Sequence, residues 1–168
     1  MLSSCAIIQS DSTVDPAYKQ KLSHVEVWSG LKNVNFLPGL IKPSTSFQSA
    51  FQSALLTKFA ADGIDANYIE KTDTVALSAN SSTTFTKIGS SKARLVILLR
   101  QSSYRSRGAP YLELAVFDLH LYSTEDNSLI WQAKISIDAS IDVPRWGDAT
   151  ANKFVEKIFE LLKKDGLA

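Results

Sequence analysis

The clearest pattern in the chain is an alternation of apolar and polar residues near its C-terminal end. Between positions 129 and 141 the odd positions are apolar, and most of the even positions between them are polar. A period of two is typical of a strand that buries one face of an antiparallel sheet. A second long strand is predicted over 111–122, and the turn sequence S-T-E-D-N-S joins the two.

Shorter apolar runs predict the other strands. Five consecutive apolar residues, Leu95 to Leu99, suit a strand that is covered on both faces. With the two strands above, it completes a C-terminal three-strand meander. The run S-H-V-E-V-W-S-G indicates a first strand that ends at Gly30, and a short strand is expected over about 66–71.

Two amphipathic stretches predict helices. Phe47, Phe51 and Phe59 belong to an apolar stripe with helical spacing, and the helix is expected to end at Gly63. Asp148 is the expected N-cap of a second helix, which carries its own apolar stripe and closes at a D-G-L sequence.

The order of these elements indicates an α+β fold, with a mostly antiparallel sheet and two helices packed on one face. The pattern over 73–92 predicts no element. We expect residues 1–21 to be a lipobox remnant and polar tether, and residues 22–168 to form a single domain.

Charge and composition narrow the function classes. Lys and Arg total 18, Asp and Glu total 17, and the formal net charge is +1. No global charge attracts nucleic acid, so no nucleic-acid partner is expected. A single cysteine excludes a zinc site built on cysteine pairs, and no motif indicates another metal or cofactor.

The single cysteine lies in a distinctive context at the start of the chain. Leu2-Ser3-Ser4-Cys5 resembles the lipobox of bacterial lipoproteins, in which an aliphatic residue and two small residues precede a cysteine. The resemblance implies that Cys5 is acylated and becomes the mature N-terminus. The apolar region of an export signal does not precede it, so a trimmed chain, a misplaced start and a chance match stay open, as does a free thiol.

The body of the chain is similar to small bacterial envelope lipoproteins of uncharacterised function. The similarity covers most of residues 25–167 and is carried by the D-G helix ends, the strand A-R-L-V-I-L-L and the hairpin S-T-E-D-N-S-L-I-W-Q-A. With Ala6 after the cysteine, it implies a lipid-anchored domain on the periplasmic face of the outer membrane. It implies no catalytic residue.

Two surface sites are candidates for binding. Arg100, Tyr104, Arg105 and Arg107 lie among small residues between two strands, and guanidinium groups suit phosphate or carboxylate partners, although a solvated hairpin tip is the alternative. Arg145 and Trp146 precede the last helix and could form an interface, or Trp146 could pack on the core.

Asp118 and His120 are two residues apart on a strand and therefore face the same side. They could form a general base with an orienting carboxylate, but structural roles in the sheet are the alternative.

The leading hypothesis is a non-enzymatic envelope lipoprotein whose periplasm-facing domain binds a protein or an envelope polymer, or assists assembly. One alternative is a small-ligand or lipid-binding domain that assists transport, with a pocket between helices and sheet. The other is a hydrolytic enzyme that uses Asp118 and His120.

Overall fold

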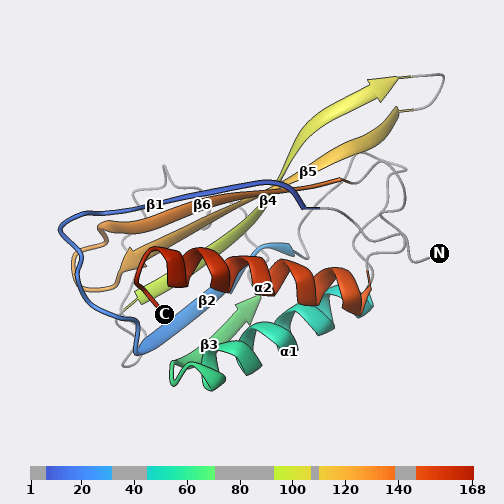
Figure 1. Cartoon of the computed structure of the whole chain (residues 1–168). Helices are drawn as coiled ribbons and strands as arrows, with labels where there is room; N and C mark the ends of the chain where they lie inside the picture. Colours follow the sequence, from blue (N-terminus) through green and yellow to red (C-terminus); the bar gives the residue numbers. More distant parts are fainter. Residues whose placement is uncertain (1–6, 32–44, 71–92, 107–109, 139–146) are drawn as a thin grey trace.

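The structure is a computed structural model of the 168-residue chain that describes residues 7–31, 45–70, 93–106, 110–138 and 147–168. Its helices and strands follow one another as shown in Figure 1: β1 (Ile7–Val14), β2 (His24–Ser29), α1 (Thr45–Ala61), β3 (Asp65–Glu70), β4 (Ala93–Ser106), β5 (Pro110–Ser123), β6 (Leu129–Asp138) and α2 (Asp148–Lys164).

The strands form one mixed sheet of six strands in the order β1-β6-β5-β4-β2-β3. β2 runs parallel to both β3 and β4, and the other neighbours are antiparallel. The predicted α+β class is confirmed. The predicted C-terminal strands β4, β5 and β6 are consecutive antiparallel neighbours, but they belong to a mixed sheet of six strands and do not form the sheet alone. β2, α1 and β3 form a parallel crossover. The apolar runs of these two strands are too short to have indicated parallel pairing in the sequence.

The polar stretch near the N-terminus is a strand, not a tether. β1 pairs antiparallel with β6 over its whole length, from Ile7 beside Ile137 to Val14 beside Trp131. Its polar composition misled the prediction because β1 is an edge strand, where Asp11 and Thr13 remain exposed to water. Backbone hydrogen bonds to β6 hold the strand despite its few apolar side chains.

Both helices end as the D-G-apolar sequences predict. Gly63 has a φ of 71° and Gly166 a φ of 77°, in the left-handed region that favours glycine. The N–H groups of Ile64 and Leu167 donate to the carbonyls of Phe59 and Leu162, both at 2.8 Å, which is the Schellman pattern.

The predicted N-cap of the second helix is off by one residue. Asp148 is the first residue of α2, and Gly147 occupies the N-cap position without a side-chain cap. The carboxylate of Asp148 still lies in the first turn, where the positive end of the helix dipole favours it.

Aromatic contacts join the two helices to the sheet in one core. The Phe154 ring of α2 lies with its centroid 5.3 Å from that of Phe51 in α1 and 4.3 Å from that of Phe117 in β5. All three side chains have no exposed surface. The helices lie side by side, with α1 alongside α2 (Figure 1).

The hairpin of β4 and β5 extends past the rest of the sheet. β2 pairs with β4 only up to Ile97, and β6 pairs with β5 only from Leu114 onward. Residues 101–106 of β4 thus have no β2 neighbour in the described sheet, and residues 110–113 of β5 have no β6 neighbour. These two segments are called the arm below, and Figure 1 shows the hairpin projecting from the body. Two register shifts, between Gln101 and Ser103 and between Ser103 and Tyr104, mark the departure. Such irregularities bend and twist a hairpin.

Replacing Phe154 with alanine tests the core. We expect the free energy of unfolding to fall by about 3–5 kcal/mol, because the ring touches both α1 and the sheet and its loss leaves a cavity. The measurement is urea denaturation followed by circular dichroism. Lys153→Ala, an exposed neighbour on α2, should change stability by no more than about 0.5 kcal/mol. Equal effects of the two changes would contradict this core.

Candidate functional site

The side of the sheet opposite to the main core, called the second face below, carries most of the chemistry among the described side chains. Core residues such as Val25, Val27, Leu95 and Ile97 alternate along β2 and β4 with residues of the other parity. Because neighbouring side chains of a strand point to opposite faces, those other residues form the second face. Its members are Glu26, Trp28, Arg94, Val96, Asp118, His120, Tyr122, Gln132 and Lys134.

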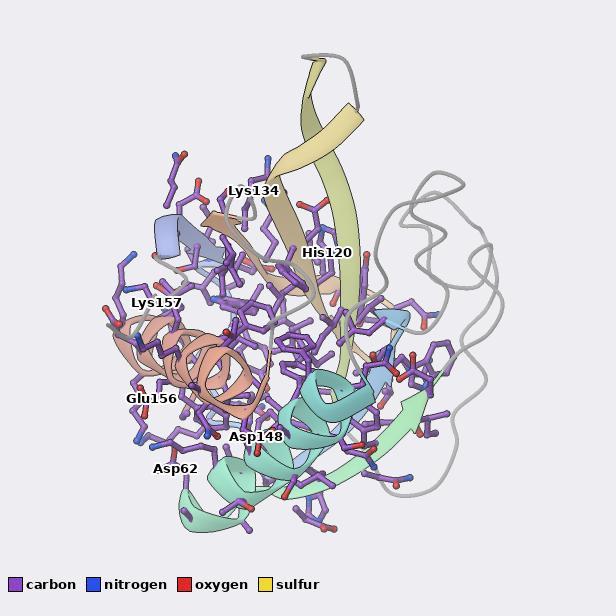
Figure 2. All side chains as sticks on the ribbon, turned by 90° about the vertical axis from the view of Figure 1, so that its right-hand side faces the viewer. Asp62, His120, Lys134, Asp148, Glu156 and Lys157 are labelled. Carbon is purple, nitrogen blue, oxygen red and sulfur yellow. The ribbon has the colours of Figure 1, made fainter. Side chains whose placement is uncertain are left out.

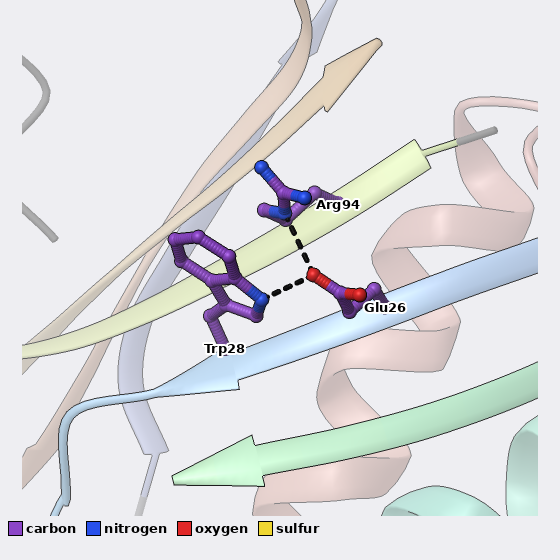
Figure 3. Close-up of polar contacts among 3 residues, drawn as sticks. All are labelled: Glu26, Trp28 and Arg94. Carbon is purple, nitrogen blue, oxygen red and sulfur yellow. Dashed lines mark hydrogen bonds and ion pairs between the residues drawn. The ribbon is translucent and has the colours of Figure 1, made fainter. Parts of the chain in front are cut away.

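A buried ion pair between β2 and β4 lies at the centre of this face (Figure 3). The parallel register places Glu26 beside Arg94, and Arg94 Nε donates to Glu26 Oε1 at 2.9 Å. The indole Nε1 of Trp28 donates to the same oxygen. The guanidinium carbon of Arg94 also lies 4.0 Å from the centroid of the Trp28 ring, a cation–π contact.

The network is almost completely shielded from water. The side chains of Glu26 and Arg94 are each 1% exposed, and Trp28 is 7% exposed. Moving two charges out of water costs several kcal/mol per ion, which short hydrogen bonds and mutual attraction must offset. The shared carboxylate oxygen and the stacked indole supply that compensation, so the three side chains act as one unit.

A small apolar cluster continues the network along the second face. Trp28 and Val96 are buried together, with Ile69 of β3 and Tyr122 of β5 packed against them. Burial raises the pKa of the Tyr122 phenol above its ordinary value. The cluster joins β3, β2, β4 and β5 on the side away from the helices.

Toward β6 the second face becomes polar and accessible. Gln132 and Lys134 are exposed, and the register places them beside His120 and Asp118 of β5. Figure 2 shows His120 and Lys134 by the strands, apart from α1 and α2. A flat row of charged and amide groups beside an aromatic cluster is suited to recognition of a partner surface.

Asp118 and His120 do share one face, as the sequence predicted. Asp118 is 7% exposed and His120 is partly buried, with its ring centroid 6.1 Å from that of Tyr122. Both therefore belong to the packed row of the second face. Their use as a catalytic pair stays a prediction.

The remaining predicted site residues lie at the arm or outside the described residues. Arg100, Tyr104 and Arg105 are on β4, where the backbone pairs with Val116, Leu112 and Tyr111. Cys5, Arg107, Arg145 and Trp146 lie outside the described residues.

The Glu26–Arg94 pair was not predicted from the sequence. The alternation of β2 already placed Glu26 and Trp28 on one parity, and Arg94 stands at the start of an apolar run. A charged residue within a strand expected to be covered on both faces indicates a buried partner. Only the parallel pairing of β2 with β4 identifies that partner.

Two further properties hold for the part of the chain that the structure describes. Within it, no group of three or more His, Cys, Asp and Glu side chains could hold a metal ion. Nor is any helix there both long and apolar enough to cross a bilayer.

The ion pair is tested by a double-mutant cycle. We expect Glu26→Leu and Arg94→Met each to lower the free energy of unfolding by about 3–5 kcal/mol, because each leaves one buried charge without its partner. The double variant should be more stable than either single variant, since neither charge of the pair then remains buried without the other. Urea denaturation of the four proteins gives the coupling energy.

The matched control is the exposed pair Lys157–Glu160 on α2, whose charged atoms are 2.8 Å apart. Lys157→Met and Glu160→Leu should show a coupling of at most about 1 kcal/mol. Strictly additive losses at Glu26 and Arg94 would mean that the two side chains do not act as one unit.

Comparison with known proteins finds no matching family model and no matching curated protein. Among solved structures, a PelC dodecamer from Paraburkholderia phytofirmans is 14% identical with a TM-score of 0.47, over 95% of this chain and 98% of that chain. A leucine-to-methionine variant of the PelC dodecamer from the same organism gives 14% identity and a TM-score of 0.49, over 95% and 97%. At these values the likeness establishes neither a shared family nor a shared function.

Proposed function

We propose that this chain is a bacterial envelope lipoprotein that is anchored through Cys5 and uses its α+β domain to bind an envelope protein or polymer. The anchor is an acylated thiol in the lipobox-like sequence Leu2-Ser3-Ser4-Cys5. With Ala6 following the cysteine, the membrane is the outer membrane and the domain faces the periplasm. The domain acts by recognition rather than by catalysis.

The observation that carries this proposal is the short distance in sequence between Cys5 and the sheet. β1 begins at Ile7, two residues after the cysteine. Two residues span at most about 7 Å, so an acyl group on Cys5 would hold the edge of the sheet close to the lipid surface. An anchor joined directly to a paired strand fixes the domain against the membrane.

The second face of the sheet supports a binding role. It combines the partly buried ring of Tyr122 with the exposed side chains of Gln132 and Lys134 on one flat surface. Aromatic and polar groups in this arrangement suit a partner that is itself flat or extended.

The alternative of a ligand pocket between the helices and the sheet has less support. The core stripe of α1 is filled by Phe47, Phe51, Leu55 and Phe59, each with no exposed surface. Phe59 packs edge-on against Phe159 of α2 with centroids 4.8 Å apart. These contacts argue for a packed interior rather than for a cavity.

The proposal is tested by expressing the chain from its full native reading frame in a Gram-negative host. Mass spectrometry of the purified protein should show a lipid-sized mass increment on Cys5, because the lipobox directs acylation of that thiol. The protein should fractionate with the outer membrane.

Cys5→Ser is the matched variant and should abolish both the mass increment and the membrane fractionation. Its circular dichroism spectrum should match that of the unsubstituted chain, since Cys5 precedes the first strand. A bare thiol on a protein that fractionates with soluble proteins would refute the anchor.

A further inference from the structure

Two strand ends and the base of the arm meet at one end of the fold. Ile7 at the start of β1 and Ala115 near the base of the arm both lie beside Ile137, near the end of β6. Since neighbouring strands are about 5 Å apart, the start of β1 and the base of the arm are separated by about 10 Å. Figure 1 shows both at the same end of the sheet, with the arm extending beyond it.

The sequence of the arm and its flanks carries a net positive charge. Residues 99–113 contain Arg100, Arg105 and Arg107 and a single acidic residue, Glu113 at the base of the arm. Two tyrosines, Tyr104 and Tyr111, lie in the same stretch. The chain as a whole is nearly neutral, with a formal charge of +1, so this cationic stretch is a local feature and not a reflection of the average.

The arm also lacks the support that the rest of the sheet has. In its outer part, residues 104–106 pair with residues 110–112 as a two-stranded ribbon without a third strand from the described sheet. An isolated hairpin is marginally stable in water. A surface that contacts the ribbon would stabilise it, and its charge favours an anionic surface.

We propose that the arm docks on an anionic phospholipid surface through Arg105 and through Arg100, the residue just before the arm on β4, as a second attachment beside the lipid anchor. This inference rests on the proposed function, because acylation of Cys5 is what would bring the arm to the membrane. Guanidinium groups bind lipid phosphates in a bidentate manner, and tyrosine is enriched at membrane interfaces. Each basic residue near an anionic membrane contributes about 1 kcal/mol.

The juxtaposition favours lipid over other anionic partners. Cys5 can lie no more than about 7 Å from the start of β1, and the base of the arm is about 10 Å from that start. Acylation of Cys5 would therefore place the arm at the lipid surface without a further contact. An acidic protein or a second copy of the chain could contact the arm in any orientation, so neither explains why the arm lies beside the proposed anchor.

The test uses the unacylated chain, so that its result does not depend on lipidation in cells. The Cys5→Ser protein is sedimented at low ionic strength with vesicles of phosphatidylcholine, with or without phosphatidylglycerol. We expect binding only to the vesicles that contain phosphatidylglycerol, and loss of that binding in high salt. Arg100→Gln combined with Arg105→Gln should lower the partition coefficient by about 30-fold.

The matched control is Lys19→Gln combined with Lys164→Gln, which removes the same charge from two exposed lysines, one after the end of β1 and one at the last residue of α2. This variant should keep most of the binding. An equal loss in the two variants would overturn the proposal, because binding would then reflect net charge alone. So would equal partition onto the two kinds of vesicle.

A second measurement identifies what the arm contacts. Since Cys5 is the only cysteine, its thiol can be coupled to a maleimide lipid in the same two kinds of vesicle. Amide hydrogen exchange in residues 101–106 should be slower on phosphatidylglycerol-containing vesicles than on phosphatidylcholine vesicles. Protection that depends on protein density and not on lipid charge would overturn the proposal in favour of contact between copies.

If Cys5 proves unacylated in cells but the arm binds anionic vesicles, the proposed function fails and the docking surface remains. If Cys5 is acylated but the arm shows no lipid-dependent binding, the docking proposal alone fails.

Discussion

The arrangement of the whole sheet depends on the backbone pairing of β6 on both of its edges. β6 hydrogen-bonds to β1 on one side and to β5 on the other, while its odd-numbered residues, such as Ile135 and Ile137, fill the core. A one-residue slip in β6 would exchange its two faces, so burial of the isoleucines fixes the register. That register also brings together two segments that are far apart in the sequence. It places the start of β1 close to the base of the β4–β5 arm, with β6 between them.

The periodicity of apolar residues in the sequence was enough to predict the elements that are positioned by burial of their side chains. The alternation of β6, the apolar stripes of the two helices and the glycines that end them were all predicted correctly, because in each case burial or backbone conformation requires a particular residue type. β1 and the parallel pairing of β2 were not. An edge strand such as β1 is held by backbone hydrogen bonds, which depend little on the identity of the side chains, so its polar side chains carried no signal.

The candidate site shows the same limit. That Asp118 and His120 share a face follows from their spacing alone, but the partner of Glu26 lies 68 positions away in the sequence and is set by strand order. A buried charge pair of this kind contributes little net stability compared with apolar residues of similar size. The pair instead favours one alignment of β2 and β4 over others, because any alternative alignment would bury Glu26 or Arg94 without its partner.

The short sequence between Cys5 and β1 has a consequence for the affinity of the domain for a partner at the membrane. If Cys5 is acylated, as we propose, only Ala6 separates the attachment point from β1. The domain would then have little freedom to tumble, and every group at that end would be confined to a thin layer next to the bilayer. Confinement of that kind corresponds to a local concentration in the millimolar range. An interaction too weak to detect between molecules free in solution would then be fully formed in the anchored protein. A few side chains would therefore be enough to set the orientation of the protein.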